Sequence, residues 1–178
     1  MNELLDKENP ILRQTAEPIT ATEFDNEWLR NLVQTMIDIM AEKGAVGVAA
    51  PQIGISKRVI VFGTNYTKRR KPEHPIPDTV LINPSLRVLS EEIQTDYEGC
   101  LNCGELMGKV PRAMTIEYSG FDLTGNKITK QVTGLEARIV QHEIDHLDGF
   151  LFFDRVEDQD SLTTFSELQS NTSSIINN

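Results

Sequence analysis

Gln141-His142-Glu143-Ile144-Asp145-His146 is the stretch that distinguishes this chain from a generic globular protein. Its two histidines are four residues apart, and on a helix this spacing places both imidazoles on one face, about one turn apart. Apolar neighbours predict a helix that begins at Leu135, ends near Gly149 and buries one face in a core. Glu143 follows the first histidine directly, where a carboxylate can serve as general base beside a divalent metal. The stretch therefore predicts a metal-binding helix.

A catalytic metal of this kind takes three protein ligands, so a third ligand is needed. One metalloprotease pattern would place a histidine where Phe152 stands, and phenylalanine cannot bind a metal. Glu167 has a spacing compatible with a thermolysin-like pattern, but it falls in a polar tail. Cys100 follows Glu98-Gly99, a pair that permits a turn, and a thiolate with two imidazoles forms a tetrahedral site for Fe(II), Zn(II) or related metals. Cys100 is therefore the preferred third ligand, although the usual role of a lone cysteine is that of a small buried apolar residue.

Composition limits the possible classes of protein. A chain of 178 residues fits one domain, and we expect one domain over residues 1–178, with a polar tail from about residue 157 that holds a short helix before a disordered end. A net charge of -10 argues against a nucleic-acid-binding surface. Neither a membrane span of ~20 apolar residues nor an apolar signal core is found. Two cysteines, Cys100 and Cys103, are a poor framework for a secreted fold, so a cytoplasmic location is expected.

Hydrophobic periodicity predicts the remaining elements. Apolar residues recur every three or four positions from Phe24 to Glu42, which is typical of an amphipathic helix that packs on the core. Residues 1–22 are expected to form an extended arm, residues 44–54, taken alone, a tight turn, and the basic run 68–71 a solvated loop. The predicted strands are Arg58–Gly63, Thr79–Pro84, Leu86–Tyr97, Val110–Tyr118 and Lys127–Thr133.

Three short motifs occur in a fixed order along the chain. They read Ala-Val-Gly-Val-Ala-Ala-Pro-Gln at residues 45–52, Glu-Gly-Cys-Leu-Asn at residues 98–102, and Gln-His-Glu-Ile-Asp-His at residues 141–146. In this order and spacing, the chain resembles the peptide deformylase family from about Ile11 to Phe153. The resemblance implies an α+β fold, with mixed or antiparallel β-sheets around a central metal-binding helix. It also implies an amidohydrolase that removes the formyl group from the N-terminal formyl-methionine of newly made polypeptides and releases formate.

The resemblance implies a role for each residue of the site. One divalent metal would be bound, with Fe(II) as the native ion and Zn(II), Ni(II) or Co(II) as substitutes; it would activate a water and polarise the formyl carbonyl. Glu143 would move the proton from that water to the departing amine. The Gln52 amide and the Leu101 backbone N–H would stabilise the charge on the formyl oxygen. The implied metal ligands are Cys100, His142 and His146.

Further residues are hypotheses for the surroundings of the centre. Glu98, Arg112 and Asp145 are expected to orient the ligands or one another. A flexible apolar pocket for the methionine side chain is expected from Val46, Gly47, Leu135 and Ile139.

The chain departs from the family pattern at four positions near the site, which are Ala45, Asn102, Gly104 and Met107. None of them removes a predicted metal ligand or proton carrier, so we expect an intact site with an altered reach for substrate. Cys103 also gives Cys100 an oxidation partner, which predicts stronger inactivation in air.

Partners and alternatives follow from the same residues. Formyl-methionyl nascent peptides are the expected substrates. Some relatives bind the ribosome through a basic C-terminal helix, but residues 156–178 contain no Lys or Arg, so we do not expect this contact here. Neither membrane association nor direct nucleic-acid binding is expected. Two alternatives remain open: a non-catalytic, deformylase-like peptide-binding protein, and a thermolysin-like metallopeptidase that would use Glu167.

Overall fold

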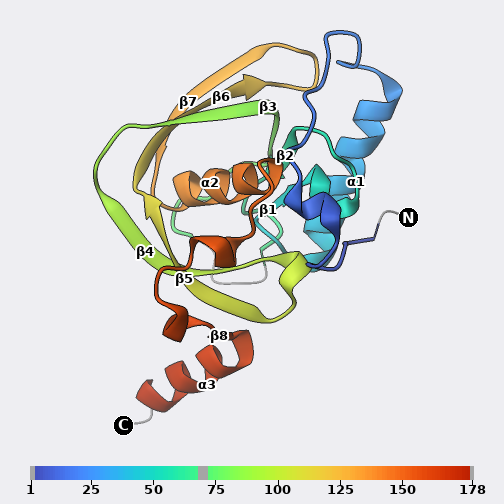
Figure 1. The fold of residues 1–178 in the computed structure, drawn as a ribbon. Coiled ribbons are helices and arrows are strands. Elements are labelled where there is room, and N and C mark those ends of the chain that lie inside the picture. Colours follow the sequence, from blue (N-terminus) through green and yellow to red (C-terminus); the bar gives the residue numbers. More distant parts are fainter. Residues whose placement is uncertain (1–2, 68–71, 177–178) are drawn as a thin grey trace.

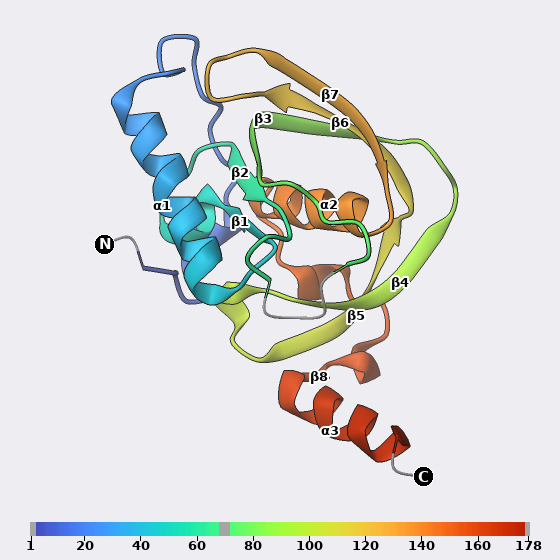
Figure 2. The same cartoon turned by 180° about the vertical axis from the view of Figure 1, so that it is seen from behind.

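The computed structural model describes residues 3–67 and 72–176, with side chains up to residue 170. Two antiparallel β-sheets wrap around one central helix, and a second helix lies outside the larger sheet (Figures 1 and 2). The predicted α+β class and the central position of the metal-binding helix are therefore confirmed. The predicted basic loop at residues 68–71 and the end of the tail at residues 177–178 lie outside the described residues.

The central helix, α2 (Leu135–Leu147), has nearly the predicted bounds. Gly134 before it and Gly149 after it have positive φ values of 63° and 83°. A Cβ at Gly149 would collide with the backbone of Arg13, so glycine is required there for space as well as for φ. These two glycines fix the length of the helix and allow the chain to leave it at both ends.

The larger sheet contains five strands, all of whose pairings are antiparallel. Their order across the sheet is β1 (Gly47–Ala49), β2 (Val59–Phe62), β3 (Thr79–Val88), β6 (Thr115–Phe121) and β7 (Lys127–Thr133). β1 is an edge strand, and it carries the glycine-rich motif that precedes Gln52.

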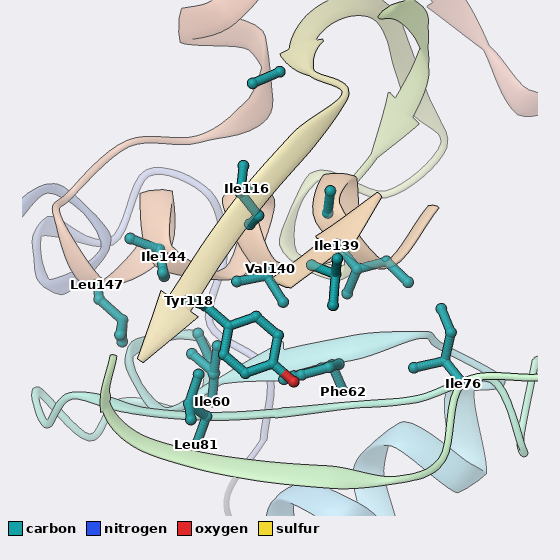
Figure 3. Close-up of a cluster of buried hydrophobic side chains, with 14 of the residues drawn as sticks. Ile60, Phe62, Ile76, Leu81, Ile116, Tyr118, Ile139, Val140, Ile144 and Leu147 are labelled. Atoms are coloured by element: carbon teal, nitrogen blue, oxygen red, sulfur yellow. The ribbon is translucent and has the colours of Figure 1, made fainter. Parts of the chain in front are cut away.

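Both faces of β2 are covered, which explains its continuous run of apolar residues. Ile60 and Phe62 face α2 and pack in the cluster that also contains Val140 (Figure 3). Val59 and Val61 belong to the other cluster, which is built on α1 (Glu27–Lys43). The larger sheet therefore packs between α1 and α2, and α2 is the helix that carries the paired histidines.

The smaller sheet has the order β4 (Ile93–Gly99), β5 (Leu106–Ala113) and β8 (Thr163–Thr164). Between β4 and β5 the chain makes a short 3₁₀ turn, Leu101–Cys103, directly after Cys100. The C-terminal helix α3 (Phe165–Ile176) follows β8 and points away from the body of the molecule (Figure 1). The smaller sheet therefore brings Cys100 towards α2.

The N-terminal elements differ from their predictions in detail. The helix predicted from Phe24 begins at Glu27, because the Asn26 side chain accepts a hydrogen bond from the Leu29 backbone N–H and caps the first turn. It extends to Lys43, where Gly44 ends it. The expected extended arm contains a 3₁₀ turn over Pro10–Arg13. The segment read alone as a tight turn instead forms strand β1 and a second 3₁₀ turn, Ala50–Ile53.

Three predicted strand boundaries are wrong. Asn83-Pro84 was expected to stop a strand, but β3 continues to Val88 through a shift of register between Ile82 and Ser85. The predicted strand Leu86–Tyr97 therefore divides between β3 and β4. The predicted strand Val110–Tyr118 divides between β5 and β6 at Met114. In β3 the shift of register lets the strand continue past Pro84, which has no N–H to donate to a neighbouring strand.

Among the described residues, the structure has no helix that is both long enough and apolar enough to cross a membrane.

Candidate active site

Three potential metal-binding atoms converge beneath the cleft of the molecule. α2 supplies His142 and His146, one turn apart, and the end of β4 supplies Cys100. One ligand atom from each side chain lies within 4.8 Å of the other two, and Cys100 Sγ is 3.4 Å from His146 Nε2. The sequence reasoning chose these three residues, and the fold brings them together from positions that are over forty residues apart.

This donor set fits a divalent metal. Metal–sulfur and metal–nitrogen bonds of about 2.3 and 2.0 Å in a tetrahedral site separate the two donor atoms by about 3.5 Å, close to the distance between Cys100 Sγ and His146 Nε2. Burial holds the pKa of His146 well below its ordinary value, so this imidazole is neutral, as metal binding requires. The chain therefore provides a Cys-His-His centre for one divalent ion.

Glu98 orients the first histidine. Its Oε2 atom lies 2.9 Å from His142 Nδ1, which leaves Nε2 of that ring for the metal. Arg112 donates two hydrogen bonds of 3.0 Å to Glu98, and Arg138 donates one of 2.7 Å. Burial alone would raise the pKa of Glu98, but the hydrogen bonds from His142 and Arg112 hold this pKa below its ordinary value. Glu98 is therefore a charged, fully bonded support for His142.

Asp145 is held in the same network and is not one of the metal donors. Its Oδ2 atom accepts a hydrogen bond of 2.5 Å from Arg112, and Oδ1 accepts one of 2.7 Å from Arg155. Arg112 thus bridges Asp145 on α2 and Glu98 on β4. The three residues predicted to surround the centre are in one connected ion-pair network.

Glu143 lies beside the ligands and is almost completely buried. Its Oε2 atom has no hydrogen-bond partner among the described residues. Burial raises the pKa of Glu143 to about 7, which suits a group that must accept and return a proton near neutral pH. A Cβ at Gly47 would overlap the Glu143 carboxylate, so the glycine of β1 leaves the room that this side chain occupies.

Gln52 is fixed by hydrogen bonds at both ends of its side-chain amide. The Ala49 backbone N–H donates to Oε1 at 2.8 Å, while Nε2 donates to Asn102 Oδ1 at 2.7 Å and lies 3.3 Å from Cys100 Sγ. Asn102 in turn donates to the Leu5 carbonyl oxygen at 2.7 Å and to the Gln52 carbonyl oxygen at 3.1 Å. The amide N–H groups therefore face the metal donors, and the carbonyl oxygen faces away from them.

A cleft of about 880 Å³ opens onto this centre. Cys100, His142, Glu143, Gln52 and Leu101 line its inner part. Its walls include all four residues predicted for the methionine pocket, namely Val46, Gly47, Leu135 and Ile139.

Sequence reasoning missed two arginines of the ion-pair network. Arg138 lies four residues before His142 on the same face of α2, and a basic residue on the ligand face was a usable signal. Arg155 follows the helix in a 3₁₀ turn, and nothing in its neighbourhood indicated Asp145 as its partner. Glu167, the less favoured third ligand, accepts hydrogen bonds from Thr163 and Thr164 at the start of α3 and is not in the group of metal donors.

Fold and site together define a metal-dependent hydrolase with a Cys-His-His centre and an adjacent buried carboxylate. The family model described as polypeptide deformylase matches residues 1–161. Peptide deformylase 1 of Nitrosomonas europaea is 43% identical over 150 residues, which cover 84% of each chain, and peptide deformylase 1 of Bordetella pertussis is 40% identical with the same coverage. The chain belongs to the polypeptide deformylase family, whose members are hydrolases that remove N-terminal formyl groups.

Solved structures of the family agree with this fold. A class I type b peptide deformylase from Acinetobacter baumannii with Met-Ala-Ser bound superposes with a TM-score of 0.80 at 34% identity, over 88% of this chain and 100% of that one. A peptide deformylase from Plasmodium falciparum has a TM-score of 0.78 at 34% identity, over 98% and 95% of the two chains.

Proposed function

We propose that the cleft binds the N-formyl-methionyl end of a new polypeptide, and that the buried centre hydrolyses its formyl amide to formate and a free amine. One observation carries the proposal: Glu143, whose Oε2 atom has no hydrogen-bond partner among the described residues, lies beside three metal-binding atoms in the lining of a cleft. A neighbour of the same fold holds Met-Ala-Ser, which has the composition of a deformylated peptide. No comparable observation favours the peptide-binding or the thermolysin-like alternative.

The metal ligands in this proposal are Cys100, His142 and His146. When bound, a divalent metal supplies a water of lowered pKa and polarises a carbonyl oxygen. Fe(II) is the proposed native ion, and Zn(II), Ni(II) or Co(II) are proposed substitutes, because a mixed thiolate and imidazole set suits all of them.

Proton transfer is assigned to Glu143. Its pKa of about 7 lets the carboxylate take a proton at neutral pH and then give it to the departing amine nitrogen. The Gln52 amide, with its N–H groups facing the metal donors, and the Leu101 backbone N–H stabilise the charge that develops on the formyl oxygen. Losing one such donor typically costs about 2.7–4 kcal/mol of transition-state stabilisation.

Recognition of the methionine end is assigned to the cleft walls. Val46, Leu135 and Ile139 provide apolar surface for the side chain, and Gly47 leaves space beside it. Because β1 is the edge of its sheet, its free side can pair with an extended peptide as an added strand. The surface thus fits an extended chain that has an apolar first residue.

The proposal is tested by formate release from formyl-Met-Ala-Ser on anaerobically metal-loaded protein. We expect turnover by the natural chain, loss of nearly all turnover with full metal content in Glu143→Ala, and loss of the metal itself in Cys100→Ser. Glu167→Ala is the matched control and should keep both metal and activity. A metal-loaded, folded chain that releases no formate would refute the proposed function, and a Glu167→Ala protein without metal would favour the thermolysin-like alternative.

We place this activity in the cytoplasm, where new polypeptides carry the formyl group. The absence of Lys and Arg from residues 156–178, with Glu157, Asp158, Asp160 and Glu167 present, opposes docking of this segment on ribosomal RNA. We therefore propose that the chain meets its substrates without a tail-mediated ribosome contact, membrane or nucleic acid.

A further inference from the structure

The two cysteines of the chain, Cys100 and Cys103, share a single turn. The Cys103 backbone N–H donates to the Cys100 carbonyl oxygen at 2.9 Å, which closes the 3₁₀ turn that follows β4. Both thiols are free and buried, three residues apart on this turn. A Cys-x-x-Cys turn that brings two thiols together permits a disulfide without rearrangement of distant elements.

The two sulfurs have different surroundings. Both belong to the apolar cluster that also contains Val110, Phe152 and Val156, but of the two only Cys100 lines the cleft. Only 7% of Cys100 and 8% of Cys103 are exposed, so large reagents are excluded. A small oxidant that enters through the cleft therefore meets Cys100 first, and Cys103 follows within the same 3₁₀ turn.

We propose that Cys100 and Cys103 are a modification site for hydroperoxides, at which a reversible disulfide withdraws Cys100 from the metal centre. The inference rests on the proposed role of Cys100 as a metal ligand. It gives Cys103 a function that a small apolar residue in the same cluster could not supply.

The chemistry is a two-step oxidation of the two thiols. The Cys100 sulfur attacks the hydroperoxide, its O–O bond breaks, and Cys100 becomes a sulfenic acid while the remaining oxygen leaves as an alcohol, or as water from hydrogen peroxide. The Cys103 sulfur then attacks the Cys100 sulfur, the S–O bond breaks, and the hydroxide that leaves takes the Cys103 proton to form water. Two thiols and one hydroperoxide thus give one disulfide, one water and one alcohol.

The disulfide has two consequences for the site. It leaves two histidines from a set of three donors, so the metal dissociates. It also protects Cys100 from the sulfinic and sulfonic acids, which cellular thiols do not reverse. Inactivation should therefore be fast but repairable by a thiol reductant and fresh metal.

The experiment uses the full chain loaded with zinc, which has no redox chemistry of its own, and treats it with hydrogen peroxide. Released zinc is followed with a chromogenic chelator, free thiols are counted, and the tryptic peptide 88–109, which holds both cysteines, is weighed without reduction. The same peptide contains Met107, which peroxide can also oxidise, so the peptide must be fragmented to show which residue carries each added oxygen. We expect both thiols to disappear together, the peptide to become lighter by two hydrogens, and zinc to be released and then rebound after reduction.

Cys103→Ala is the matched control, with Cys103→Val as the second choice if alanine leaves the cluster unstable. Either variant should bind zinc, but peroxide should make its peptide heavier by oxygens on Cys100, and reduction should not restore zinc binding. The inference is overturned if the natural chain gains oxygens on Cys100 as these variants do, if it forms disulfides between chains, or if zinc stays bound after the disulfide forms. Failure of the untreated chain to bind zinc would instead refute the proposed metal centre. In that case the peptide mass would still show whether peroxide forms the disulfide.

Discussion

At the scale of single residues, the side chains of this site are held in place by close neighbours. Glu143 fills the space that the missing side chain of Gly47 leaves open, and Gln52 is held by Ala49 on one side and Asn102 on the other. Such contacts fix the reacting groups before a substrate arrives, which is how an active site gains rate from position alone.

Gly47→Ala tests the close packing of β1 against the carboxylate of Glu143, the proposed proton carrier. The new methyl group would overlap Glu143, so we expect a loss of about 1–3 kcal/mol of unfolding free energy and, because a misplaced base reacts slowly, on the order of a hundredfold loss of kcat. Denaturant unfolding and formate release measure the two effects. In a Glu143→Ala background the overlap is gone, so the same substitution should cost little stability; an equal cost in both backgrounds would contradict this explanation.

Asn102→Ala tests the support of Gln52. The alanine removes the acceptor that orients the Gln52 amide and the donor that holds the Leu5 carbonyl, so we expect kcat/KM to fall roughly tenfold, as for about 1.4 kcal/mol of lost stabilisation. Metal content should not change, because no ligand is lost. Asn102→Ser, whose hydroxyl can replace part of the lost hydrogen bonding, should lie between the two proteins. An unchanged kcat/KM in Asn102→Ala would show that Ala49 alone orients Gln52.

At the scale of elements, boundaries set by neighbouring residues could be predicted from the sequence. Boundaries and contacts set by residues far apart in the chain could not. The bounds of α2 were predictable because glycines mark both of its ends. The extent of β3 was not, because a bulge carries the chain past Pro84 and the pairing with β6 resumes only at Ser85. In the site, ligand spacing revealed His142 and His146, whereas the contact of Arg138 with Glu98 depends on how α2 lies across β4.

The C-terminal element gives a prediction about substrate length. β8 pairs with β5 through Leu106 and Met107, and it places Phe165 and Gln169 of α3 in the outer wall of the cleft. A chain that ends at residue 161 should therefore process formyl-methionine amides normally but lose several-fold in kcat/KM for longer peptides, because only these reach the outer wall.

The control for this prediction is a chain that ends at residue 170, which keeps both side chains and should resemble the full-length protein. Formate release from a series of formyl-methionyl peptides of increasing length compares the three proteins. Equal losses for short and long peptides in the shorter chain would mean that residues 162–170 support the fold rather than the substrate.

At the scale of the whole molecule, the metal centre is where the two sheets and the central helix are joined. Cys100 comes from the end of β4 in the smaller sheet, and both histidines come from α2, whose apolar face packs on the larger sheet. The ion pairs of Arg112 and Arg138 with Glu98 make a second connection between β4 and its surroundings. A metal bound here would add one more connection between these parts of the chain.

Removal of the metal should therefore lower the stability of the whole fold. A ligand that binds only the native state adds about 2.7 kcal/mol when its free concentration is a hundred times Kd, and in a chain of this size that corresponds to a shift in Tm of roughly 5–10 °C. Calorimetry of chelator-treated protein, titrated with Zn(II), should show Tm rising with zinc concentration. Cys100→Ser, which loses one of three donors, should show little or no rise over the same range. If the natural chain unfolds at the same temperature with and without zinc, the centre does not join the sheets and the helix energetically, and its role is confined to chemistry.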